Sequence, residues 1–266
     1  MRVKTARIVA QGDNLNERNR EFQQARLQGP VFLNSVPKCG THLFRNIVRM
    51  FVPVEQQYHR TFIQIPILRQ HLQAFTHARP MLSWGHLLFS DDSARALKGV
   101  RHTVLVRDPY DWVLARARFF LSDTFKGQMD QLKGGAVSVE EVLNMMIFGI
   151  YDKAPSMQDI FVHNAAAWLG TQARILKMEE LLHAVRNLDA NEAEDYFAEI
   201  LGFLGLGPLP DDWRERVRVG SDRKQSGTAR ENLAGPASDV PNELPEDQRR
   251  LVDFAIPGLR ELLGYA

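Results

Sequence analysis

Short runs of apolar residues recur along the chain, and each is too short to form a helix of ordinary length. They cover residues 30–36, 81–86, 101–106 and 173–178. Each run is followed by a segment whose apolar residues have helical spacing. Strands that alternate with helices in this way predict a parallel sheet covered by helices on both faces.

The segments between the runs supply the helices. Residues 41–52 place four apolar side chains three or four positions apart, which is the spacing of one helix face. After the third run, Asp108 is a suitable N-cap and Pro109 suits a first helical turn. Further helices are expected at 90–98, 138–149, 155–169, 179–185, 191–204 and 245–262.

We expect a single domain over residues 1–266, an α/β fold of three layers with a central parallel sheet flanked by helices. Residues 1–28 are polar and predict an N-terminal extension or a surface helix. Residues 219–242 are rich in Gly, Ser, Pro and charged residues, which is typical of a long loop.

Composition narrows the class of protein without naming a function. Of the 266 residues 44% are apolar and 24% charged, and the formal net charge is +1, so no overall field favours nucleic acid. Cys39 is the only cysteine, which excludes an internal disulfide and a cysteine-rich zinc site. No secretory signal and no apolar run of membrane-spanning length is found. We therefore expect a cytoplasmic protein with no metal.

The joint between the first run and its helix carries the first candidate chemistry. In a parallel sheet, ligands bind at the carboxyl ends of the strands, where Pro37–Thr41, Gly85–His86 and Arg107–Asp108 fall. A helix N-terminus attracts anions, Gly40 allows close approach of a phosphate, and Lys38 adds a positive charge. Thr41 could cap the helix or bond a phosphate oxygen. The same residues would also suit a plain tight turn.

The octapeptide PKCGTHLF at residues 37–44 resembles the 5′-phosphosulfate loop of the cytosolic-type sulfotransferases, P-K-S-G-T-T-W-L. These enzymes use 3′-phosphoadenosine 5′-phosphosulfate (PAPS) as sulfuryl donor and release adenosine 3′,5′-bisphosphate (PAP). The resemblance implies a P-loop-like fold and a bacterial-like member of this family. The residues that it assigns to the cofactor loop are Pro37, Lys38, Cys39, Gly40, Thr41 and His42.

The segment RHTVLVRDPYDW is similar to the family's second signature, in which an arginine after a strand binds the 3′-phosphate. This position is Arg107. The family places a serine eight residues later, where this chain has Ala115. One expected contact to the 3′-phosphate is therefore missing, and Arg116 or Arg118 could replace it.

Two further segments extend the resemblance. His86 in MLSWGHLLF occupies the position of the family's catalytic histidine, about twenty residues before the arginine. SDRKQSGTARENL resembles a degenerate form of the late loop that covers the nucleotide, with Ser226, Thr228 and Arg230 in a Ser-x-Thr-x-Arg pattern. The resemblance thus assigns Arg230 to the cofactor and residues 219–242 to a nucleotide-covering loop.

Together these motifs predict transfer of a sulfuryl group from PAPS to a hydroxyl group of a small-molecule acceptor. His86 would be the general base, and Lys38 would stabilise the leaving nucleotide. The partners expected are that acceptor and PAPS, with no nucleic acid and no membrane span, and a homodimer is left open. Residues expected to line the acceptor pocket, unless they are core, are Tyr58, Phe62, Phe119, Phe120 and Phe125.

Two other functions compete with this reading. An ATP-dependent small-molecule kinase would need a Gly-Lys loop, but the chain contains no Gly-Lys dipeptide. A catalytically weak or inactive binding or scaffold protein with the sulfotransferase fold would explain Ala115 and the degenerate late loop. A scaffold, however, has no need to keep Lys38, His86 and Arg107 together.

Overall fold

The computed structural model describes residues 7–8, 12–122, 125–126, 130–227 and 239–265. Contacts divide the chain into two compact units. Unit 1 comprises Met1–Gly12, Arg107–Val162 and Gly227–Ala266, and unit 2 comprises Asp13–Val106 and His163–Ser226. The expectation of a single domain over the whole chain stays a prediction.

Unit 2 is built on a parallel sheet whose strands match the four predicted runs. They are β2 (Val31–Ser35), β3 (Leu82–Gly85), β4 (Arg101–Val106) and β6 (Arg174–Lys177). Their order is β3-β2-β4-β6, with every neighbouring pair parallel. After β2 the chain forms β3 on one side of β2 and then β4 on its other side. Such a switch point opens a crevice at the carboxyl ends of these two strands.

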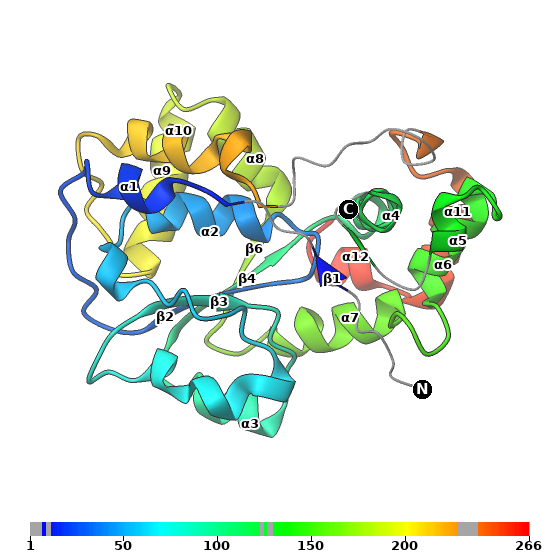
Figure 1. The fold of residues 1–266 in the computed structure, drawn as a ribbon, viewed down its shortest axis with the longest axis horizontal. Coiled ribbons are helices and arrows are strands. Elements are labelled where there is room, and N and C mark those ends of the chain that lie inside the picture. The colour runs from blue at the N-terminus through cyan, green and yellow to red at the C-terminus, as the bar shows by residue number, and fades with distance from the viewer. Residues whose placement is uncertain (1–6, 9–11, 123–124, 127–129, 228–238, 266) are drawn as a thin grey trace. The chain divides into compact units, whose positions relative to one another are not determined.

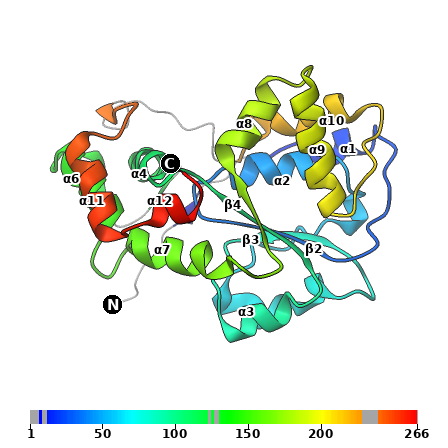
Figure 2. The same ribbon diagram turned by 180° about the vertical axis from the view of Figure 1, so that it is seen from behind.

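Helices cover both faces of this sheet. Figure 1 shows α2, α8, α9 and α10 on one face and α3 on the other, and Figure 2 shows the same layers from behind. The helices of unit 2, with η marking 3-10 helices, are α1 (Leu15–Asn19), α2 (Thr41–Arg49), η1 (Val54–Gln56), η2 (Ile65–Phe75), α3 (Asp91–Ala96), η3 (Ala166–Trp168), α8 (Met178–Arg186), α9 (Asn191–Phe203), α10 (Trp213–Ser221) and η4 (Arg223–Gln225). The three-layer parallel fold class is therefore confirmed.

Unit 1 is mainly helical. Its elements are β1 (Arg7–Ile8), α4 (Pro109–Leu121), β5 (Phe125–Lys126), α5 (Asp130–Lys133), α6 (Val139–Phe148), α7 (Met157–Asn164), α11 (Glu246–Ala255) and α12 (Leu259–Leu262), and the last two residues of α7 belong to unit 2. Strands β1 and β5 pair antiparallel. Asp108 caps α4 as predicted, because its side chain accepts a hydrogen bond of 2.9 Å from the Tyr110 amide. The buried guanidinium of Arg116 donates to the carbonyls of Met146 and Pro155, which ties α4 to the segment after α6.

Two of the longer helices, α10 and η2, have no counterpart among the predictions. Residues 219–221, expected in a long loop, complete α10, and η2 begins at Ile65 with Pro66 in its first turn. The spacing of apolar residues does not reveal α10, because the residues that this helix buries include an arginine and a glycine and form no continuous apolar stripe: Trp213, Arg216, Val217, Val219 and Gly220. Within the described ranges, no helix combines the length and apolar content needed to cross a lipid bilayer.

Close contact between α10 and α2 generates a stability prediction at Gly220. A Cβ added there would lie 2.5 Å from Ile47 Cα and 2.7 Å from the Asn46 carbonyl oxygen. Gly220→Ala should therefore lower the free energy of unfolding by about 1–3 kcal/mol, as overpacking does. Denaturant titration measures this change.

Gly202 in α9 is the matched control, because a Cβ there meets nothing within 4 Å. Gly202→Ala should raise the free energy of unfolding by about 0.5–1 kcal/mol through helix propensity alone. Equal effects at the two glycines would contradict the tight crossing of α10 over α2.

Candidate functional site in unit 2

The loop after β2 begins with a tight turn. The Val36 amide donates to the Leu105 carbonyl at 3.0 Å, and the Val36 carbonyl accepts from the Cys39 amide at 3.2 Å. Pro37 and Lys38 occupy the two central positions of this turn, and Lys38 has a φ of 69°. Proline followed by a residue of positive φ is the pattern of a type II turn, which normally takes glycine at the second position. A lysine held there stores strain of about 1–3 kcal/mol, which is typical of functional sites.

Gly40 then starts α2 and leaves its first amides without a side-chain cap. It has a φ of 85° and serves as N-cap with no side-chain hydrogen bond. The first N–H groups of a helix have no partner inside the helix, so this end can bind an anion. A Cβ at Gly40 would overlap the side chain of Met178, the first residue of α8, which would have to move, and a φ of 85° would strain any other residue here. Cys39 is 0% exposed, and its amide already donates to the Val36 carbonyl inside the turn.

One predicted role of Thr41 was to cap α2. Thr41 does not cap this helix, because it is already the first helical residue. Its Oγ1 instead lies 2.6 Å from Ser35 Oγ, in the last residue of β2. Ser35 was not predicted as a site residue. The only sequence signal for it is a polar pair, Asn34 and Ser35, that ends an otherwise apolar run.

His86 follows β3 directly and is bonded to the end of β2. Its Nδ1 lies 2.9 Å from the Ser35 carbonyl oxygen and 3.3 Å from Ser35 Oγ. Because a carbonyl can only accept, Nδ1 must carry the proton, and Nε2 of the neutral ring then holds the lone pair. Nε2 is therefore the ring nitrogen that can accept a proton.

The surroundings of His86 keep it neutral. Burial of the ring lowers the pKa of His86 below its ordinary value, and the positive charge of Lys38 lowers this pKa further. The hydrogen bond to Ser35 acts in the opposite direction and does not outweigh burial. At neutral pH the imidazole is therefore in the form that can take up a proton.

The backbone before His86 requires Gly85. The segment at Ile63 pairs with the end of β3, since the Ile63 amide donates to the Trp84 carbonyl at 3.0 Å and the His86 amide to the Ile63 carbonyl at 3.1 Å. A Cβ at Gly85 would lie 2.0 Å from the Ile63 carbonyl oxygen. The glycine therefore lets a second segment fix the backbone of His86.

Of the aromatic residues expected to line an acceptor pocket, Phe62 lies beside His86. The two ring centroids are 5.7 Å apart, and the Phe62 centroid is 5.5 Å from that of His42. Tyr58 is buried, and its hydroxyl lies 2.7 Å from His71 Nδ1. In unit 1, Phe119, Phe120 and Phe125 pack on one another.

His42, in the first turn of α2, is also neutral. Burial, followed by the positive charges of Arg45 and Lys38, lowers the pKa of His42 to about 3. Its Nδ1 is buried and has no hydrogen-bond partner. A buried polar atom without a partner at the first turn of the helix fits a loop that binds a polar ligand.

The structure therefore brings together residues 37–42 and His86 in unit 2. Arg107 directly follows β4 in the chain but belongs to unit 1, so its participation stays a prediction. Arg230 and Thr228 lie outside the described residues, as do residues 228–238 of the predicted covering loop, whereas Ser226 is buried.

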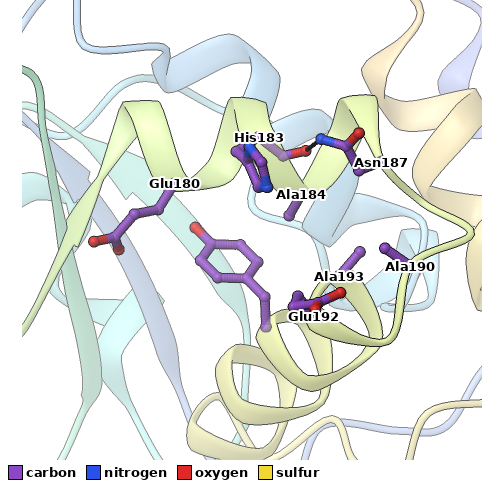
Figure 3. Close-up of a pocket in the computed structure, with 8 residues that line it drawn as sticks. Glu180, His183, Ala184, Asn187, Ala190, Glu192 and Ala193 are labelled. Atoms are coloured by element: carbon purple, nitrogen blue, oxygen red, sulfur yellow. Dashed lines mark hydrogen bonds between the residues drawn. The ribbon is translucent and has the colours of Figure 1, made fainter.

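Two hollows in unit 2 are separate from these residues. One, of about 230 Å³, lies between α8 and α9 (Figure 3), and another, of about 320 Å³, lies beside α3. None of the predicted site residues lines either hollow.

Comparison with known proteins gives a fold. No family model matches the chain, and no curated protein matches it by sequence. Mouse sulfotransferase SULT7A1, solved with PAP, is similar over 97% of this chain and 95% of its own, with a TM-score of 0.57 and 15% identity. The chain has the sulfotransferase fold.

Retinol dehydratase has the same fold. Its structure with retinol and PAP covers 89% of this chain and 82% of its own, with a TM-score of 0.52 and 15% identity. Its structure with androsterone and PAP gives the same coverage, a TM-score of 0.50 and 16% identity. The sulfotransferase fold predicted from the motifs is therefore confirmed.

Burial of His42 generates a prediction on acid stability. Between pH 6.5 and about 3, the unfolded chain binds a proton at His42 that the folded chain does not. The folded state thus loses stability as the pH falls through this range, by up to about 1.4 kcal/mol per pH unit for one proton. His42→Gln should remove this part of the slope, measured by denaturant titration between pH 7 and pH 4. An equal change from His77→Gln, which removes an exposed histidine, would contradict the role of burial.

Proposed function

We propose that this protein is a PAPS-dependent sulfotransferase that transfers a sulfuryl group to the hydroxyl of a small-molecule acceptor. The observation that carries the proposal is the hydrogen bond from His86 Nδ1 to the Ser35 carbonyl, beside the uncapped start of α2. It joins a base of defined tautomer to an anion-binding loop. PAPS, when bound, supplies the activated sulfuryl group, and the backbone and side chains of residues 37–42 hold its 5′ end.

His86 is the general base of the proposed reaction. Its Nε2 accepts the proton of the acceptor hydroxyl as the oxygen attacks, and such assistance typically contributes about 10²–10⁴-fold in rate. The lowered pKa of His86 keeps the ring unprotonated at neutral pH. Phe62, whose ring lies beside that of His86, forms one apolar wall for the acceptor.

Lys38 and the first amides of α2 stabilise the charge that grows on the leaving nucleotide. The turn holds Lys38 in the left-handed backbone conformation. The rest of the fold must offset the strain of this conformation. Sulfuryl transfer resembles phosphoryl transfer, in which the protein acts mainly by positioning and electrostatic stabilisation. Arg107, through paired charge-assisted hydrogen bonds, and Arg230 are assigned to the nucleotide by motif resemblance.

The acceptor is a small molecule with a hydroxyl group and an apolar body. Retinol dehydratase was solved with retinol and with androsterone, and this supports an acceptor of similar character here. Phe62 also supports it, because small-ligand sites are mostly apolar with few polar groups.

Nucleotide selectivity tests the proposal. Without magnesium, isothermal titration should give PAP an affinity at least about tenfold higher than that of adenosine 5′-monophosphate, because a hydrogen bond to a charged group contributes about 1.5–3 kcal/mol. Arg107→Ala should abolish this difference, since only the 3′-phosphate distinguishes the two ligands. Arg250→Ala, which removes an exposed arginine of α11, should leave it unchanged.

Equal affinities for the two nucleotides in the wild-type protein would overturn the proposal. Tight binding of ADP that requires magnesium would favour the kinase alternative. Selective PAP binding with no sulfuryl transfer to any of a panel of phenols and alcohols would favour the inactive binding protein.

Lys38→Ala should lower turnover far more than nucleotide affinity, because the charge that Lys38 meets develops mainly in the transition state. We expect a loss of about 10²–10³-fold in kcat, similar to the loss of one oxyanion donor. The rate of PAP release from PAPS with an accepted phenol measures it. Alanine, like lysine, has a Cβ at this position of positive φ, so the backbone strain is nearly unchanged and the substitution tests the amine of Lys38. Unchanged turnover, or an equal loss from Lys98→Ala at an exposed lysine, would remove Lys38 from this role.

A further inference from the structure

A buried asparagine side chain also bonds to the Ser35 carbonyl that accepts from His86. Asn164 is the last residue of α7 and is 0% exposed. Its Nδ2 donates to the Ser35 carbonyl oxygen at 2.8 Å, the same atom that accepts from His86 Nδ1 at 2.9 Å. One carbonyl oxygen therefore receives two hydrogen bonds, one from the proposed base and one from Asn164.

Stability alone does not explain an asparagine at this position. Its Oδ1 is buried and has no hydrogen-bond partner. Burying a polar atom without a partner costs free energy, and an apolar side chain of similar volume would avoid that cost. A buried amide that is only half satisfied needs another explanation, and catalysis is a frequent one.

Two hydrogen-bond arrangements compete at His86 Nδ1. The Ser35 carbonyl stabilises the tautomer with the proton on Nδ1, whereas a hydroxyl proton from Ser35 Oγ, 3.3 Å away, would stabilise the opposite tautomer. In the second tautomer Nε2 carries the proton and cannot act as a base. Which tautomer His86 adopts therefore depends on the orientation of the Ser35 carbonyl and hydroxyl groups.

We propose that Asn164 is a positioning residue that selects the reactive tautomer of His86. Its amide holds the Ser35 carbonyl in place, so that this oxygen remains the acceptor for Nδ1–H. Thr41 Oγ1, 2.6 Å from Ser35 Oγ, provides an alternative acceptor for the Ser35 hydroxyl proton. The consequence for catalysis rests on the proposed role of His86 as the base, while the effect on the tautomer does not.

The test is Asn164→Leu, read out by nitrogen-15 NMR of the imidazole rings. In the wild type, the His86 signals should show a protonated Nδ1 and an unprotonated Nε2. In the variant, the two tautomers should become mixed. With an accepted phenol, kcat should fall at least about tenfold and the affinity for PAP should stay within about twofold. The melting temperature should be unchanged or higher, because the unpartnered Oδ1 is gone.

Asn19→Leu is the matched control. Asn19 is also buried in unit 2, and its Nδ2 donates to the carbonyls of Arg49 and Val52 at 2.6 and 3.0 Å. Its loss should lower the melting temperature and leave the His86 tautomer as in the wild type. If Asn164→Leu does not fold, Asn164→Ala, which adds no bulk, provides the same NMR comparison.

A wild-type tautomer in the folded Asn164 variant would overturn the proposal, as would a mixed tautomer with full kcat. Failure of the proposed function gives a different result. In that case the wild type transfers no sulfuryl group, yet the tautomer still changes in the variant, which supports the positioning of His86 by Asn164.

Discussion

The end of strand β2 is held from several directions, and the site depends on that constraint. β2 pairs with β3 on one side and with β4 on the other, and all five of its residues are buried. The Val36 amide still donates to β4, so the chain has little freedom before it turns into α2. It makes the turn with two residues of positive φ, Lys38 and Gly40. The packing of β2 and α2 must offset the strain of Lys38, because isolated peptides seldom adopt this conformation.

The functional groups of unit 2 follow from this fixed strand end. Ser35, the last residue of β2, offers its carbonyl to His86 and Asn164 and its hydroxyl to Thr41. His86 is fixed from its own side by Ile63, whose close approach requires Gly85. Met178 packs where a side chain on Gly40 would lie, so α8 also supports the turn. A local change at β2 would therefore alter the position of His86, the Pro37–Gly40 turn and the start of α2 together.

The sequence predicts the parts of this arrangement that depend on local patterns. Short, largely apolar runs locate all four parallel strands, and three of these strands, β2, β3 and β4, are buried along nearly their whole length. The Lys38–Gly40 joint and His86 are recognisable because their residue types fit a motif in order. Helix α10 was missed, since its packing relies on Gly220 and long amphipathic side chains that no period reveals. Asn164 could not be found at all, because it reaches Ser35 from a helix 129 residues away in the chain.

The central claim is that the start of α2 binds the 5′-phosphate of the nucleotide through its backbone amides. The most direct measurement is a proton–nitrogen NMR titration with PAP that follows each backbone amide of unit 2. The claim predicts that the largest shifts are those of the Gly40, Thr41, His42 and Leu43 amides, since amides that gain a charged acceptor change most. Saturable binding of PAP that leaves these four amides unshifted, or that instead shifts the residues of the hollow between α8 and α9, would contradict it.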